Sequence, residues 1–221
     1  MFKQIFELFK SDSLYEQALQ ECHEMLEIDR QMFNESINTL RNSDTGDIPI
    51  DIYAMDKKIN EFERDVRRKV MTHLAVSGRN DLGSGLILVS VVIDIERIGD
   101  YTKNIYDLAL QHPKKLSGGE YDEELSNIEL ATKEFLNNAI DAFKTQDIDK
   151  ARRLMLDYKT DIASVSTEIV DGIVSGKNQS FSSEEAGSLC LYARYLKRIA
   201  AHSRNLVSSI VNPFERIGYP E

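Results

Sequence analysis

Apolar residues recur along most of the chain at intervals of three and four, which is the spacing of one face of an α-helix. Comparable stripes predict helices over about residues 14–40, 125–143, 148–173 and 189–210. Prolines occur only at positions 49, 113, 213 and 220, so little interrupts these segments. The clearest stripe predicts a further long helix and consists of Ile52, Met55, Ile59, Phe62, Val66, Val70 and Leu74.

The segment from residue 82 to about residue 110 admits two interpretations. Its β-branched run over residues 89–95 is compatible with a strand. The amphipathic pattern, however, continues without a proline through the whole segment, and we therefore predict a third long helix. The residues of this helix that we expect to face the core are Leu82, Leu86, Val89 and Ile93.

The chain therefore consists of three helices, a break and three more helices, and the two halves align with each other. Arg97 corresponds to Arg198 at an offset of 101 residues, and Asp56 corresponds to Asp157 at the same offset. In the first helix of each half the offset is 103. We predict an all-α protein built from two tandem three-helix bundles with six long helices. The expected domains are residues 1–112 and residues 120–212, followed by a C-terminal tail over residues 213–221.

The chain is acidic, because 27 Lys and Arg against 37 Asp and Glu among 221 residues give a net charge of −10. Nucleic acid and anionic lipid are disfavoured as partners, since both repel a net anion. Cys22 and Cys190 lie far apart without a CxxC spacing, which gives no support for a zinc ribbon or a disulfide framework. No apolar run approaches the ~20 residues of a membrane span, and the first residues lack a signal-peptide pattern. We expect a cytoplasmic protein.

The segment DIERIGD at residues 94–100 is the most informative one, because its Glu96 and Asp100 are one helical turn apart. Their carboxylates share a helix face and repel each other, and a divalent or trivalent cation would relieve that repulsion. Oxygen ligands suit hard ions such as Mg²⁺, Mn²⁺, Ca²⁺ or iron. The alternative is a solvated acidic face with Arg97 as its counter-charge. The preceding helix offers more oxygen ligands at Asp56, Asn60, Glu63 and Asp65.

The matching helix of the second half has lost both acids, because Lys197 and Ala201 stand at their positions. The helix before it keeps an acid pair one turn apart, Asp157 and Asp161. Any cation site in the second half would therefore have a reduced set of ligands. His202 adds a nitrogen donor, although a single helical histidine is more often an ordinary polar residue.

The sequence contains none of the enzyme motifs for which we searched. A glycine-rich phosphate loop, a GxSxG elbow and an HExxH motif are all missing, and no histidine lies at the Glu-x-x-His spacing of helical di-iron enzymes. We expect a protein that is not an enzyme. A basic cluster is either a solvated helix face or a docking surface for phosphate or an acidic partner, and it consists of Arg64, Arg67, Arg68 and Lys69.

The pentad ERIGD at residues 96–100, placed in a duplicated helical chain, resembles the PhoU family of phosphate-uptake regulators, whose three-helix bundles carry Glu/Asp-x-x-x-Asp motifs. The likeness extends to residues 56–60 (DKKIN) and to residues 193–205 of the second half. It implies a non-enzymatic adaptor that binds metal ions on its acid motifs, forms a homodimer and negatively regulates phosphate uptake. Such an adaptor links the ATPase subunit of a phosphate ABC transporter to a sensor histidine kinase.

The resemblance implies bound iron, zinc, manganese or magnesium. Two alternatives stay open. One is a soluble regulatory partner or domain of a sodium- or proton-coupled phosphate transporter, and the other is a helical interaction module without metal. Carried over residue by residue, the metal ligands implied by the resemblance are Glu96, Asp100, Asp56 and Asn60 in the first repeat and Asp157 and Asp161 in the second.

Overall fold

The structure is a computed structural model that describes residues 13–77, 81–112, 114–176 and 180–221. All regular elements of these residues are helical. The first half contains α2 (Leu14–Asn42), α3 (Ile52–Ser77) and α4 (Leu82–Gln111). The second half contains η2 (Gly119–Tyr121), α5 (Asp122–Thr145), α6 (Ile148–Tyr158), η3 (Lys159–Ser164), α7 (Val165–Val174), α8 (Ser183–Val211) and η4 (Phe214–Arg216).

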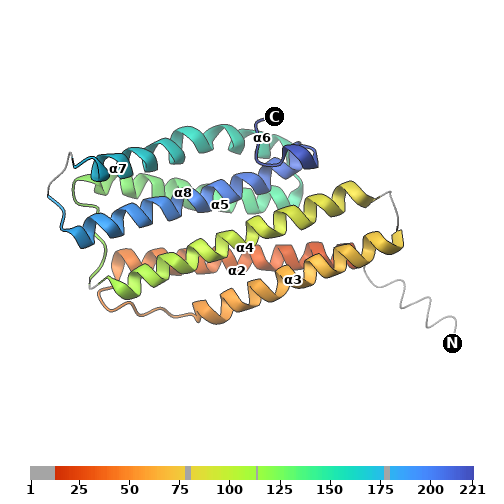
Figure 1. Ribbon diagram of the computed structural model, residues 1–221, viewed down its shortest axis with the longest axis horizontal. Helices are drawn as coiled ribbons and strands as arrows, with labels where there is room; N and C mark the ends of the chain where they lie inside the picture. The colour runs from red at the N-terminus through yellow and green to blue at the C-terminus, as the bar shows by residue number, and fades with distance from the viewer. Residues whose placement is uncertain (1–12, 78–80, 113, 177–179) are drawn as a thin grey trace.

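Two three-helix layers lie side by side along their length (Figure 1). One layer contains α2, α3 and α4, and the other contains α5, α8 and the segment formed by α6, η3 and α7. The prediction of an all-α protein with two tandem three-helix bundles is confirmed. In the described parts of the chain, no helix is both long and apolar enough to cross a membrane.

Side-chain caps define where several of these helices begin. Ser13 before α2 and Ser182 before α8 each form a capping box with the glutamate three residues later. Asp147 accepts a hydrogen bond from a backbone amide in the first turn of α6. Each such cap contributes about 1 kcal/mol relative to alanine, so the polar residues between the apolar stripes fix the helix starts.

The first and third helices of the two bundles bury equivalent positions. Between α2 and α5 the offset is 103, and the buried pairs include Met25 with Ile128 and Phe33 with Leu136. Between α4 and α8 the offset is 101, and the buried pairs include Val92 with Ala193, Ile95 with Leu196 and Ile98 with Ile199. The duplication predicted for these helices therefore extends to their packing.

The predicted offset of 101 is wrong for the middle helices. At that offset Ile59 and Val66, which are buried in α3, match Thr160 and Thr167, which are exposed. At an offset of 103, which is also the offset of the first helices, they match Ile162 and Ile169, which are buried. Only two residues connect α5 to α6, whereas nine connect α2 to α3. The middle helix of the second bundle also contains the π-helical turn η3, and a π turn accommodates an extra residue.

The prediction of which row of α4 faces the core is also wrong. Leu82, Leu86 and Ile93 are 47%, 37% and 38% exposed. The helix packs against α2 and α3 on one side and against α8 on the other, so its buried surface is too broad for one row to represent it. The side chains of α4 that do form the core include Leu88, Val91, Val92, Ile95 and Ile98.

The two bundles contact each other mainly through α4 and α8, and also through α2 and α5. In the middle of the α4–α8 interface, Asp94 Oδ1 accepts hydrogen bonds from His202 Nδ1 at 2.7 Å and from Asn205 Nδ2 at 2.8 Å. All three side chains are largely shielded from solvent, which makes this network a specific polar contact between the bundles.

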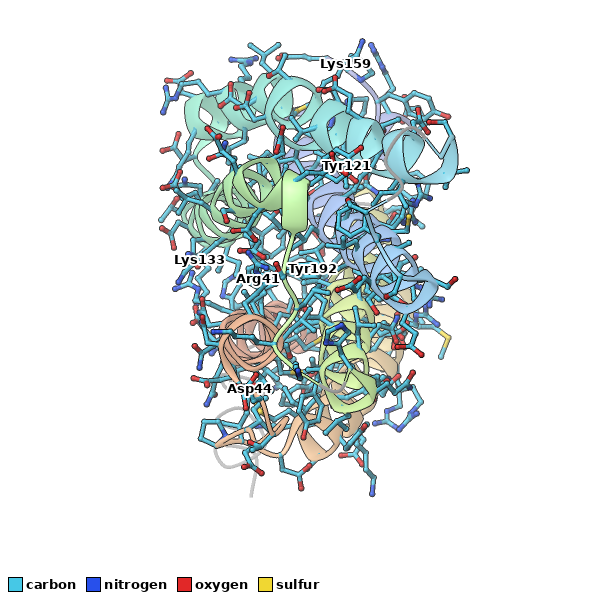
Figure 2. All side chains as sticks on the ribbon, turned by 90° about the vertical axis from the view of Figure 1, so that its left-hand side faces the viewer. Arg41, Asp44, Tyr121, Lys133, Lys159 and Tyr192 are labelled. Atoms are coloured by element: carbon cyan, nitrogen blue, oxygen red, sulfur yellow. The ribbon has the colours of Figure 1, made fainter. Side chains whose placement is uncertain are left out.

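A second polar contact lies where the chain crosses from one bundle to the other. Arg41 of α2 donates a hydrogen bond to the carbonyl of Leu116 in the connecting segment, and its Nε lies 2.8 Å from Glu129 Oε1 of α5. Viewed from the end, Arg41 and Tyr192 lie between the two layers beside this segment (Figure 2). The arginine thus ties α2, α5 and their connection together.

Candidate metal centre

The structure brings three of the predicted first-repeat ligands together between α3 and α4. Asp56 lies on α3, and Glu96 and Asp100 lie on α4. Their side chains are 16%, 13% and 27% exposed, so none of them points freely into bulk water. This arrangement differs from the solvated acidic face that was the alternative, because carboxylates on two helices share one partly buried site.

A lysine and an amide contact the acids of this cluster. Lys103 Nζ lies 2.8 Å from Asp56 Oδ1 and 3.2 Å from Asp100 Oδ1, so one ammonium bridges the two helices. Asn60 Nδ2 donates to the backbone carbonyl of Asp56 at 2.9 Å and approaches its carboxylate at 3.4 Å. Asn60 therefore orients Asp56, while Lys103 supplies the positive charge that the acids attract.

Asp29 of α2 belongs to this cluster, and the sequence analysis missed it. Its side chain is completely buried, and both carboxylate oxygens lack a hydrogen-bond partner. Burial raises the pKa of Asp29 well above its ordinary value, and the nearby charges of Glu96, Asp56 and Asp100 raise it further. A buried carboxylate without a partner is costly, and such a group calls for a ligand or a proton.

The sequence does carry a signal for Asp29. On α2 the buried stripe runs through Cys22, Met25 and Leu26 and continues at Met32. Asp29 occupies the position of that stripe where another apolar residue would be expected. An acid in register with a core stripe is therefore the pattern that would have identified this residue.

The glycine of the ERIGD pentad makes room for Asp29. A Cβ atom at Gly99 would lie 2.9 Å from Asp29 Oδ1 and 2.9 Å from Ile59 Cδ1. Any larger residue at this position would push the buried carboxylate away from α4. Gly99 thus lets α2 place an oxygen beside the helix turn that carries Glu96 and Asp100.

Glu96 has a strongly altered ionisation. Burial raises its pKa to about 7, and the neighbouring carboxylate of Asp100 contributes in the same direction. Arg97 acts against this rise from the outer side, where its guanidinium lies 3.5 Å from Glu96 and 2.9 Å from Asp100. The cluster therefore sets four carboxyl groups against the two cations Arg97 and Lys103, and the raised pKa values of Asp29 and Glu96 favour protonation of these two groups.

The chemistry of this donor set fits a hard multivalent cation. All its acceptors are oxygens, and the orphaned Asp29 carboxylate is an observation that a bound cation would account for. In the described residues, however, no three His, Cys, Asp or Glu side chains converge tightly enough to form a ready-made metal site. Lys103 is already placed between two of the acids, so the side chains would have to rearrange to hold an ion.

The second-repeat candidates lie elsewhere. Asp157 and Asp161 are exposed, and together with α5 they line a small cavity of about 120 Å³. Lys197, at the position of Glu96, donates to Thr167 at 2.7 Å. At the offset of 103, the buried Thr132 replaces Asp29. The structure therefore does not gather an equivalent acid cluster among these residues.

Two other polar groups singled out in the sequence have partners within the chain. His202 pairs with Asp94 at 2.7 Å across the interface of the bundles. In the basic cluster, Arg67 pairs with Glu63 at 2.7 Å, Arg68 with Asp65, and Lys69 with both Asp65 and Glu21. Internal pairing of this kind is typical of a solvated helix face.

Both bundles match a known domain family. The model of the PhoU domain matches residues 22–109 and 125–210. The chain is 24% identical over 180 residues to the phosphate-specific transport system accessory protein PhoU homolog of Pseudomonas aeruginosa, an alignment that covers 80% of this chain and 74% of that protein. It is 25% identical over 197 residues to PhoU homolog 1 of Thermotoga maritima, with 85% and 81% covered.

Solved structures agree with the fold. The crystal structure of PhoU from Pseudomonas aeruginosa superposes with a TM-score of 0.75 at 21% identity, over 90% of this chain and 95% of that one. The phosphate transport system regulatory protein PhoU from Streptococcus pneumoniae superposes with a TM-score of 0.76 at 18% identity, over 88% and 92%. Because one family model matches each of the two bundles and most of the chain, this protein belongs to the PhoU family.

Proposed function

We propose that this chain is an accessory protein of a phosphate transport system and that it restrains phosphate uptake. The proposal is supported by family membership and by the names of the relatives, which are accessory proteins of phosphate-specific transport. No catalytic step is part of the proposal. The chain acts by binding partners through its helix faces.

The regulation that we propose depends on a metal ion held by the first-repeat cluster. The observation that carries this part is the completely buried carboxylate of Asp29. Neither of its oxygens has a hydrogen-bond partner, and the charges of three other acids raise its pKa. The residues that would hold the ion are Asp29, Asp56, Glu96 and Asp100. Once neutralised, these acids no longer repel one another, and they fix α2, α3 and α4 in one arrangement.

The partners that we propose are the ATPase subunit of a phosphate ABC transporter and a sensor histidine kinase. A rigid first bundle presents the same outer surface to both of them. We further propose a homodimer in the cytoplasm, as the family resemblance implies. Separation of the native complex and identification of its components tests these assignments directly.

The metal site is tested by measuring bound metal and Mn²⁺ affinity. We expect the double variant Glu96→Gln/Asp100→Asn to lose bound metal, since it removes two charged oxygens from the cluster. Asp29→Asn should weaken Mn²⁺ binding at least about tenfold, the scale expected from losing one charge-assisted contact. The control Glu123→Gln/Glu184→Gln removes two exposed carboxylates outside the cluster and should bind normally. Equal metal content in the wild type, the two cluster variants and the control would rule out the proposed site.

The regulatory function is tested in the native cell. Deleting the gene should raise phosphate uptake when phosphate is plentiful, and the wild-type gene should restore restraint. The Glu96→Gln/Asp100→Asn variant should fail to restore it although it folds. Unchanged uptake after deletion would contradict the proposed role, whatever metal the protein binds.

A further inference from the structure

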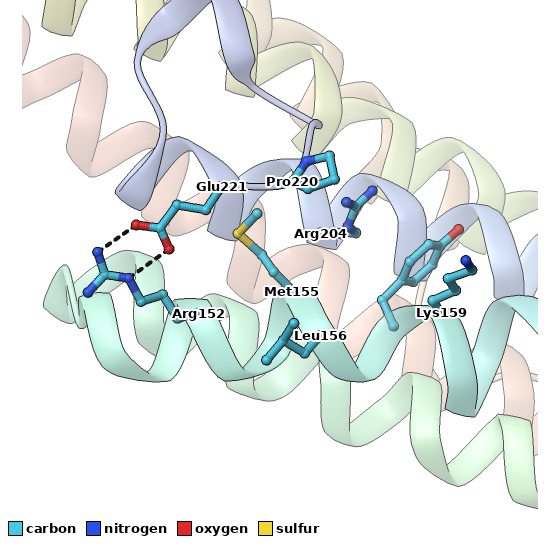
Figure 3. A pocket seen from close by; sticks show the side chains of 8 residues that line it. Arg152, Met155, Leu156, Lys159, Arg204, Pro220 and Glu221 are labelled. Atoms are coloured by element: carbon cyan, nitrogen blue, oxygen red, sulfur yellow. Dashed lines mark hydrogen bonds and ion pairs between the residues drawn. The ribbon is translucent and has the colours of Figure 1, made fainter.

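A cavity of about 520 Å³ lies between α6, the start of η3, α8 and the segment that follows α8 (Figure 3). Its volume is in the range of small-molecule sites in proteins. The cavity wall combines three cationic side chains with an aromatic ring and aliphatic groups. The lining residues are Arg152, Met155, Leu156, Tyr158, Lys159, Arg204, Pro220 and Glu221.

The three cations of this cavity are only partly neutralised. Arg152 forms a two-pronged pair with Glu221, at 2.8 Å from Nε and 2.6 Å from the NH2 group (Figure 3). Lys159 is exposed and makes no ion pair with any described residue. Arg204 donates to the carbonyl of Gly218 at 3.2 Å, and its buried Nε has no partner. Among the side chains that line the cavity, one carboxylate therefore faces three positive charges, in a chain whose net charge is −10.

An aromatic ring adjoins these charges. The guanidinium of Arg204 lies 5.5 Å from the centre of the Tyr158 ring, in a cation–π contact. Met155, Leu156 and Pro220 line the same space. The cavity thus offers an apolar and aromatic surface next to donors that match an oxyanion.

The cavity lies between the helices of the second bundle that are equivalent to α3 and α4, where the first bundle carries the acid cluster. Its charge is opposite to that of the acid cluster. Lys103 of α4 contacts α3 in the first bundle, and Arg204, its counterpart at the offset of 101, contacts α6 in the second. Where Lys103 bridges two carboxylates, Arg204 has no carboxylate partner in the described structure, because Ala201 has replaced the acid corresponding to Asp100. The second bundle therefore carries a basic site at the place equivalent to the acid cluster.

We propose that this cavity binds an organic phosphate with an aromatic body, such as a nucleoside monophosphate. Lys159 and Arg204 receive the phosphate, because arginine and lysine donors pair well with phosphate oxygens. Arg152, which lies with Glu221 at the other end of the cavity, turns toward the phosphate once Glu221 releases it (Figure 3). Tyr158, Leu156 and Pro220 pack against the aromatic body. This site is independent of the proposed metal centre.

When the cavity is empty, the Glu221 carboxylate occupies the position on Arg152 that the phosphate of the ligand would take. This carboxylate binds the Arg152 guanidinium in the two-pronged geometry that a phosphate would also use. A bound phosphate displaces it, and the segment carrying Pro220 and Glu221 then loses one attachment to α6. Ligand binding thereby changes the surface at this end of the second bundle.

The test is a calorimetric titration of the full chain with three probes: adenosine monophosphate, inorganic phosphate and adenosine. We expect adenosine monophosphate to bind more tightly than either of the other two. Lys159→Gln, at an exposed position, should weaken this binding about tenfold. Glu221→Gln should strengthen it, because Arg152 is released. Arg204→Met should weaken it as well, and circular dichroism checks that this variant folds.

The matched control is Arg153→Gln, which removes one positive charge from the adjoining helix α6 at an exposed position outside the cavity. It should bind adenosine monophosphate like the wild type. An equal loss in Arg153→Gln and Lys159→Gln would overturn the proposal, because the attraction would then be unspecific. Absence of binding by the wild type at millimolar concentration, or equal binding of inorganic phosphate, would overturn it too.

Discussion

At the scale of single residues, the most unusual group is the Asp29 carboxylate. It lies completely buried beneath Glu96 and Asp100, and neither of its oxygens finds a donor. The structure accommodates it by keeping a glycine at position 99 and by raising its pKa. Without a cation the cluster is therefore best stabilised by protons, which connects its ionisation to the stability of the fold.

Metal-free protein should lose stability as the pH rises from about 4.5 to about 7. The pKa of Glu96 is about 7 in the folded protein against 4.5 in a free side chain, so the folded state holds a proton that the unfolded chain has released. Stability is then highest below the unfolded pKa and falls through the folded one, by about 2 kcal/mol. Urea unfolding with a chelator at pH 5 and pH 8 measures this difference.

Glu96→Gln should flatten that pH dependence, because the substituted side chain does not titrate. Glu123→Gln, on the surface of α5, should keep it. Stability that increases between pH 5 and pH 8 in the chelated wild type would contradict the assigned ionisation of the cluster.

At the scale of elements, α4 shows what a hydrophobic pattern can and cannot predict. The stripe of apolar residues and the lack of proline identify the helix, and Leu82–Gln111 agrees with the predicted segment. The buried face was not predictable in the same way, because α4 contacts helices on two sides and leaves Leu86 and Ile93 exposed. A stripe identifies the buried face only when a helix packs on one side.

The candidate site was predictable only in part, because the sequence shows spacing within a helix but not the packing between helices. Glu96, Asp100 and Asp56 follow from one turn of spacing and from the family resemblance. Asp29 lies 67 residues before Glu96, and only the packing of α2 onto α4 brings it there. Asp157 and Asp161 were matched at an offset of 101, whereas the buried residues of the middle helices follow an offset of 103, and the two acids lie beside α5.

Gly99→Ala should destabilise the first bundle by about 1–3 kcal/mol, since its Cβ would overlap Asp29 and Ile59 in a packed interior. Gly187→Ala is the matched control in α8, where a Cβ has open space within 4 Å. It should stabilise the protein by about 0.5–1 kcal/mol through helix propensity. Urea unfolding of both variants gives the two values, and a neutral effect of Gly99→Ala would show that the site is loosely packed.

At the scale of the whole molecule, the two bundles are joined by polar contacts as well as by an apolar interface. Asp94 on α4 holds His202 and Asn205 of α8 through one carboxylate oxygen. Tyr101 adds a ring stacked on His202 and a hydroxyl that accepts from Arg198. These contacts fix how one repeat is placed against the other, which apolar packing alone specifies weakly.

Asp94→Ala should lower the free energy of unfolding by about 1–3 kcal/mol, because it leaves two largely buried donors without an acceptor. Asp107→Ala is the control on the same helix. It removes an acceptor for the Tyr53 hydroxyl, on the surface and within one bundle, and should cost less. Urea unfolding measures both, and a similar small loss in each would mean that the interface network adds nothing specific.

The position of Lys103 has a consequence for which ions can enter the first-repeat cluster. Its ammonium already gives Asp56 and Asp100 one positive charge, attached to the chain and present at all times. A monovalent ion brings no more charge than the group it must displace, so sodium and potassium gain little by entering. Of the ions that could take the place of this ammonium, only a multivalent one would therefore add positive charge to the cluster.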